Sequence, residues 1–183
     1  MTVSDLIDNY MLNFIFPKGE ILQLKFSLRN SFLIFLLSIL SLTISRNIVL
    51  AKDIFFFIVL FPYYLIFFML IIGIYIGSVF LVRSLKKKSY DYKHLLCIIL
   101  NFFSLYILLL PVSFICYYLN LTRYYFYIEL TISIIILFNV LKYTKAELDF
   151  SIIQMFFILV IPFMIMVLFL LSVFGLFFVS LYV

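Results

Sequence analysis

A run of 29 residues without a charged side chain, residues 54–82, limits most strongly what this chain can fold into. As an α-helix the run would be about 43 Å long, which exceeds the roughly 30 Å hydrocarbon core of a bilayer. Other apolar runs precede and follow it, and the chain as a whole is 68% hydrophobic and 11% charged. A soluble domain of 183 residues cannot bury that much apolar surface. The sequence therefore predicts an all-α, polytopic membrane protein.

We expect about five transmembrane helices after an amphipathic N-terminal segment, residues 1–29. In that segment apolar residues recur every three or four positions, which predicts a helix that lies in the membrane interface or docks on a partner. The transmembrane domain is expected over residues 30–183, with Pro62 breaking the second span and Pro111 kinking the third. The apolar run at residues 151–183 would form either one kinked helix or a span followed by a segment that turns back. Charged turns at residues 46–53 and 142–149 separate spans expected at 30–45, 54–82, 95–119, 124–141 and 151–183.

The distribution of positive charge predicts the orientation of these spans. The N-terminal segment and the second and fourth loops hold ten of the 13 Lys and Arg residues. Cytoplasmic loops are enriched in Lys and Arg, so five spans place the N-terminus in the cytoplasm and the C-terminus on the opposite side. The second loop is expected to face anionic headgroups, and we expect no nucleic-acid partner because no basic stretch is interleaved with exposed aromatics. The basic residues of this loop are Arg83, Lys86, Lys87, Lys88 and Lys93.

Two glycines within the second span, Gly73 and Gly77, predict a helix-packing face. Small residues four positions apart let another membrane helix approach closely. The chain has only four glycines, so two at this spacing are informative. Other membrane helices, from a second copy or from a partner, are therefore expected next to this span.

Glu129 is the one acidic residue placed inside an apolar run, and intramembrane carboxylates are functional candidates by default. It lies about one and a half helical turns from the interface. We therefore favour the interpretation that Glu129 reaches water or pairs with Arg123. Asn101 and Asn139 are further candidate polar residues within spans.

The sequence predicts no catalytic residue, cofactor or metal site. Cys97 and Cys116 lie 19 residues apart in one apolar run, about 28 Å along a helix, so they cannot bridge each other. Both are interpreted as small core residues. A single histidine, His94, makes neither a metal site nor a catalytic triad. We therefore expect a protein that is not an enzyme.

The layout resembles that of the Yip family, the Rab/Ypt-interacting membrane proteins and their prokaryotic relatives. A short lead with a proline precedes five spans, and a basic loop runs into the third span. Lys86-Lys87-Lys88 stands where that family has Gly-Gly, and the Tyr-Gly-Pro motif of the eukaryotic members is absent. The resemblance thus implies a prokaryote-like member that shapes or organises membranes, without small-GTPase binding. It is carried by Pro17, residues 20–26, residues 88–96, Ser104, Pro111, Leu141-Lys142 and Ser151.

Three functions remain open at this point. The favoured one is a non-enzymatic, Yip-like membrane organiser or adaptor. A second is a membrane-embedded subunit of a larger respiratory or transporter complex, because the spans are apolar all round and carry no site of their own. A third is a small transporter or channel in which Glu129, Asn101 and Asn139 line a pore.

Overall fold

The computed structural model describes residues 27–51, 54–84, 91–160 and 164, and this part of the chain is helical, with no strand. Four helices within it are long and apolar enough to cross a membrane. Of the fifth expected span, residues 152–160 and residue 164 form described helix, and most of the expected amphipathic segment lies outside the described residues. The elements are α3 (Leu28–Leu50), α4 (Ile54–Ser84), α5 (Tyr92–Phe102), η1 (Phe103–Leu108), α6 (Leu109–Tyr118) and α7 (Thr122–Leu148).

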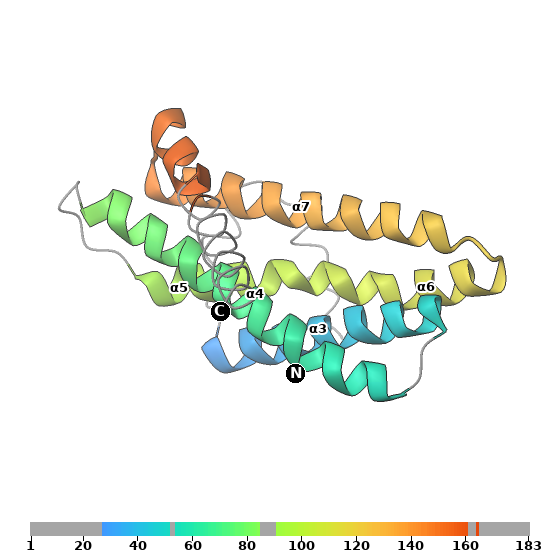
Figure 1. Cartoon of the computed structure of the whole chain (residues 1–183). Coiled ribbons are helices and arrows are strands. Elements are labelled where there is room, and N and C mark those ends of the chain that lie inside the picture. Colours follow the sequence, from blue (N-terminus) through green and yellow to red (C-terminus); the bar gives the residue numbers. More distant parts are fainter. Residues whose placement is uncertain (1–26, 52–53, 85–90, 161–163, 165–183) are drawn as a thin grey trace, which may run out of the picture.

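The third span, a rod made of α5, η1 and α6, occupies the centre of the bundle. Figure 1 shows α7 along one side of this rod, with α3 and α4 on the other side. The rod is the most buried of the four candidate spans. Helix α4 packs mainly on α3 and leaves much of its surface exposed. We call the end with the α6–α7 turn the α6–α7 end, and the opposite end the α5 end.

The rod departs from α-helical geometry just before Pro111, where the sequence predicted a kink. Six residues, η1, form a 3₁₀-helix there. Proline has no N–H, so the carbonyl four residues earlier, that of Ile107, loses its helical partner. The Ser41 hydroxyl of α3 lies 3.4 Å from this carbonyl and 3.3 Å from that of Tyr106. A side chain of the neighbouring helix thus compensates the backbone group that the proline frees.

Pro62 does not break the second span, so the break expected there is wrong. Helix α4 runs through Pro62 over 31 residues. A proline removes one backbone hydrogen bond, but the remaining bonds of a long helix keep it continuous. Pro62 is itself exposed, so its ring meets no crowded core.

Two helices extend further than the charged residues of the sequence suggested. Helix α3 continues through Arg46 to Leu50, and α7 continues past Lys142 to Leu148. Each ends where the next residue adopts positive φ, 49° at Ala51 and 50° at Asp149. The turns expected from residues 46 and 142 are therefore mostly helix, because the charged side chains are paired or exposed rather than excluded.

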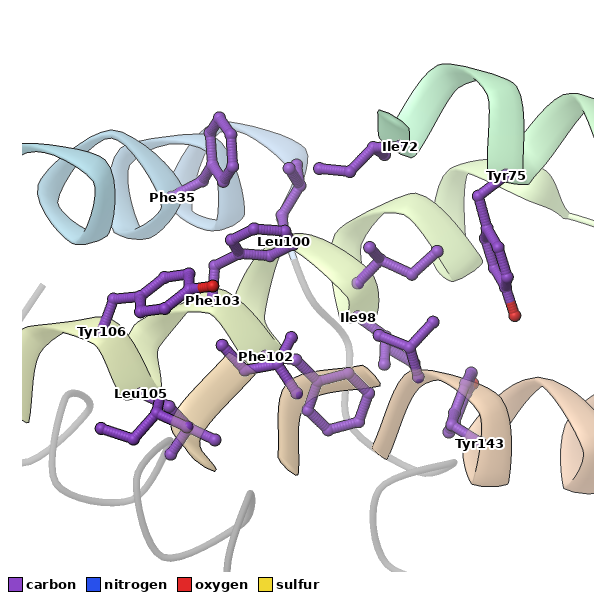
Figure 2. Packing of buried hydrophobic residues seen from close by; sticks show 14 of the residues in the cluster. Phe35, Ile72, Tyr75, Ile98, Leu100, Phe102, Phe103, Leu105, Tyr106 and Tyr143 are labelled. Atoms are coloured by element: carbon purple, nitrogen blue, oxygen red, sulfur yellow. The ribbon is translucent and has the colours of Figure 1, made fainter. Parts of the chain in front are cut away.

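Aromatic side chains fill the middle of the bundle. Phe103 of the rod meets Phe35 of α3 and Phe68 of α4 edge-on, with ring centroids 5.2 Å apart in both pairs. The ring centroids of Tyr106 and Phe68 are 5.9 Å apart. Figure 2 shows several of these side chains together. We call Phe35, Phe68, Phe103 and Tyr106 the aromatic layer.

The two cysteines behave as the sequence predicted. Cys97 and Cys116 are free and buried, on different halves of the central rod. They act as small apolar residues of the core.

Candidate functional site

An arginine and a glutamate from different helices meet inside the bundle at the α6–α7 end. Arg46 of α3 donates through Nε to both carboxylate oxygens of Glu129 on α7, at 3.0 and 2.9 Å. Its Nη2 also donates to Oε1. This two-nitrogen arrangement is the planar fork with which guanidinium groups bind carboxylates most specifically.

Helix α4 joins the pair through Tyr64. Arg46 Nη1 donates to the Tyr64 hydroxyl, and the guanidinium carbon lies 4.9 Å from the centre of that ring. One arginine therefore connects α3, α4 and α7. A cation above an aromatic ring is attracted to its face, which adds to the hydrogen bond.

This pairing corrects the expectation for Glu129. Its partner is Arg46, not Arg123, which is exposed in the first turn of α7. Glu129 does not extend to the protein surface as expected either, since only 10% of its side chain is exposed. A carboxylate that leaves water is stabilised only with a cation close by, and Arg46 supplies that cation from the facing helix.

The pair lies near the end of the bundle rather than at its middle. Arg46 is four residues from the end of α3, about 6 Å along the axis. Its side chain keeps 31% of its surface exposed. Nearby exposed tyrosines on α6 and α7 are typical of a membrane interface, and they are Tyr117, Tyr118, Tyr124 and Tyr127.

Two further tyrosines border the ion pair. Tyr125 of α7 is fully buried, with the charges of Arg46 and Glu129 acting on it. The Tyr106 hydroxyl lies 2.9 Å from that of Ser133, which itself donates to the Glu129 carbonyl at 2.8 Å. We call Arg46, Tyr64, Tyr125 and Glu129 the Arg46 cluster.

Neutral hydrogen bonds join helices at the α5 end. Asn101 of α5 donates to the Ser31 hydroxyl of α3 at 3.0 Å and to the carbonyl of Cys97 at 2.9 Å. Tyr75 of α4 donates to the Thr144 hydroxyl of α7 at 2.7 Å. These contacts connect the same outer helices, α3, α4 and α7, to one another or to the central rod.

The three polar residues predicted for a pore do not come together. Glu129 belongs to the Arg46 cluster, whereas Asn101 is bound to Ser31 and Cys97 at the α5 end. Asn139 is half-buried on α7, about 15 Å along the helix from Glu129. The aromatic layer lies between the hydrogen bonds of Asn101 and the Arg46 cluster along the rod.

Gly73 and Gly77 lie on the exposed surface of α4. A Cβ atom added at either glycine would meet no heavy atom within 4 Å in the described part of the chain. The close approach predicted there is thus not made by any of the helices described, and contact with another chain stays a prediction.

The basic loop is described only at its two ends. Arg83 closes the last turn of α4 and is buried, with an interaction partner, whereas we expected it to face headgroups. Lys93 is exposed in the first turn of α5, where Asp91 caps the helix by accepting from its N–H at 3.0 Å. Lys86, Lys87 and Lys88 lie outside the described residues.

The Arg46 cluster can hold helices and orient a small polar ligand, because it combines fixed charges with hydroxyl groups. Its charges cancel as a pair, so Glu129 is not free to bind a cation while Arg46 occupies it. Within the described ranges no three His, Cys, Asp or Glu side chains form a group of the kind that holds a metal ion.

Sequence reasoning missed Arg46 because it was assigned to a turn. Its partner lies 83 positions away, so no local spacing indicates the pair. One signal was present: successive spans are expected to alternate in direction, which places the first and third loops, and with them Arg46 and Glu129, at the same end. Comparison of the chain with protein-family models, with curated proteins and with solved structures gives no match.

Proposed function

We propose that the protein is a non-enzymatic integral membrane protein that organises membrane assemblies as an adaptor, in the manner that its resemblance to the Yip family implies. The observation that carries this proposal is the open glycine face of α4. Gly73 and Gly77 are exposed there, with nothing described within 4 Å of an added Cβ. Glycine costs a helix about 1 kcal/mol relative to alanine, so two such residues are favoured where another backbone approaches.

The internal bonding of the bundle supports the same proposal. Glu129, the intramembrane carboxylate, is neutralised by Arg46 within the chain. Together with Tyr64, this pair fixes α3, α4 and α7 relative to one another, so the outer surface of α4 is held in one position for a partner to bind. In the proposed orientation the N-terminus is cytoplasmic, the α6–α7 end faces outward, and the basic residues after α4 meet anionic headgroups.

A second candidate is a membrane-embedded subunit of a larger complex. The same face of α4 favours it, because a close helix contact suits a stable partner as well as a transient one. The two proposals differ in the partner set: a subunit has a fixed group of foreign proteins, whereas an organiser of this kind forms assemblies mainly with itself or with variable partners. The transporter alternative has less support, because the aromatic layer separates Asn101 from Glu129.

The test compares two double variants of α4 in the full chain, purified in mild detergent. Leucines at both positions, Gly73→Leu with Gly77→Leu, should abolish a specific assembly on a native gel, since their side chains prevent close backbone approach. The matched control, Gly73→Ala with Gly77→Ala, keeps the residues small and should retain most of it. Because nothing described contacts an added Cβ, both variants should fold like the wild type.

The outcomes separate the proposals. An assembly of unchanged size in the leucine variant would contradict the packing face, and a wild-type protein that is monomeric without co-purifying proteins would contradict the adaptor role. Stoichiometric foreign proteins identified by mass spectrometry would favour the subunit. Ion or proton flux through the purified protein in liposomes would instead favour a transporter.

A further inference from the structure

The hydroxyl of Tyr125 makes no hydrogen bond within the described part of the chain, although its side chain is completely buried. The residue is 0% exposed, and no described group lies within hydrogen-bond geometry of its oxygen. The neighbouring Ser45 hydroxyl donates to the carbonyl of Ser41, at 2.7 Å, and its contact with the Tyr125 hydroxyl does not reach hydrogen-bond geometry. Leaving a buried hydroxyl unbonded costs about 1–3 kcal/mol, so buried polar groups nearly always bond to protein or to an ordered water.

The ion pair beside Tyr125 has hydrogen-bonding capacity to spare. A guanidinium carries five N–H donors, and the bonds of Arg46 to Glu129 and Tyr64 use its three nitrogens with at least two hydrogens left over. Glu129 Oε2 accepts from Nε at 2.9 Å and, as a carboxylate oxygen, can accept once more. A bound water needs two to four such polar partners.

We propose that the Arg46 cluster is a binding site for water, in which a water molecule accepts from the Tyr125 hydroxyl and donates to the Glu129 carboxylate. Arg46 provides the connection to solvent, because it bonds to Glu129 and is itself 31% exposed near the end of α3. Water bound there exchanges with the aqueous phase at the α6–α7 end. This inference does not depend on the adaptor function.

Hydration of the cluster is one-sided. Beyond Glu129 toward the middle of the bundle, the Tyr106 hydroxyl is bonded to Ser133, and its ring belongs to the aromatic layer with Phe35 and Phe103. Phe35 is 0% exposed, and its edge-on packing offers no hydrogen-bonding group. The site therefore admits water from the α6–α7 end as far as Glu129 and no further.

X-ray hydroxyl-radical footprinting of the wild-type protein in nanodiscs tests this site directly. Radicals form from water where it is bound, so they oxidise side chains next to buried water as well as those on the surface. Tyr125 should be labelled well above Phe35, although both side chains are fully buried. Equal and negligible labelling of the two residues would overturn the proposal.

Removal of the hydroxyl gives a second, independent measurement. If water bonds to Tyr125, Tyr125→Phe should raise the equilibrium constant for unfolding roughly five- to tenfold, because it removes one satisfied hydrogen bond. A variant as stable as the wild type, or more stable, would show that the hydroxyl was unbonded and would overturn the proposal. Tyr118→Phe is the matched control, since Tyr118 is 79% exposed and its hydroxyl should contribute nothing measurable.

Discussion

The two ends of the bundle join the same helices with different chemistry. At the α6–α7 end one arginine connects α3, α4 and α7 through a charged fork and a tyrosine. At the α5 end the connections are neutral bonds, such as that from Tyr75 to Thr144. Arg46 and Thr144 each lie four residues from the end of their helix, so depth in the membrane alone does not explain the contrast.

The two ends differ in whether a polar group keeps a hydrogen bond in its own helix when its partner on another helix is lost. Thr144 also donates to the carbonyl of Val140 in its own helix, at 2.8 Å, and Asn101 also donates to that of Cys97. These neutral groups keep a local bond when the bond to another helix breaks. Arg46 and Glu129 carry full charges that no bond to their own backbone can neutralise, so each depends on a residue of another helix.

Removal of one charge at the α6–α7 end should produce the largest effect. Glu129→Leu leaves Arg46 without its carboxylate, and we expect the free energy of unfolding to fall by about 2–3 kcal/mol, measured by SDS titration in mixed micelles. This is below the value for a fully buried pair, because Arg46 can turn toward headgroups.

The matched control for this variant removes both charges. Arg46→Leu combined with Glu129→Leu should recover most of the lost stability, since no charge then remains unpaired. If the double variant is as unstable as Glu129→Leu alone, the loss comes from packing, and the proposed contrast between the two ends fails.

The neutral bonds of the α5 end should matter less. Tyr75→Phe removes the hydroxyl that donates to Thr144, and we expect a loss of about 0.6 kcal/mol, the average for hydrogen bonds between membrane helices. Thr144 keeps its bond to Val140, which limits the loss. The same SDS titration measures it, and a loss equal to that of Glu129→Leu would erase the distinction between a charged and a neutral end.

Much of the fold could be predicted from the sequence, because a series of long apolar runs leaves few alternatives to membrane helices. The positions of α3, α4, the central rod and α7 follow from such runs, as does the irregularity before Pro111. Helix ends were less predictable. Arg46 and Lys142 read as turn residues, whereas the fold accommodates one as a partner of Glu129 and the other at an exposed position.

The site itself was predictable only in part. Glu129 was identified because a carboxylate is rare within an apolar run, but its partner depends on which side chains the bundle brings together. Tyr125 stands in a tyrosine-rich stretch, and nothing in the spacing distinguishes it from Tyr124 or Tyr127. Its burial follows from the direction in which it projects from α7, toward Arg46 rather than outward.

The smallest expected effect concerns the segment between the two ends, where Ser41 compensates for Pro111. Ser41→Ala should lower the free energy of unfolding by about 0.5 kcal/mol, because the carbonyls of Tyr106 and Ile107 lose the hydroxyl donor of α3. In a Pro111→Ala background the alanine N–H can bond to that carbonyl, so the same Ser41→Ala change should have almost no effect. Equal losses in the two backgrounds, measured as a double-mutant cycle, would mean that Ser41 acts through packing and that the proline and the serine are independent. Coupling between them would show that a neutral hydroxyl stabilises this bundle where proline removes a backbone donor. Arg46 has a different role, because it neutralises the carboxylate of Glu129.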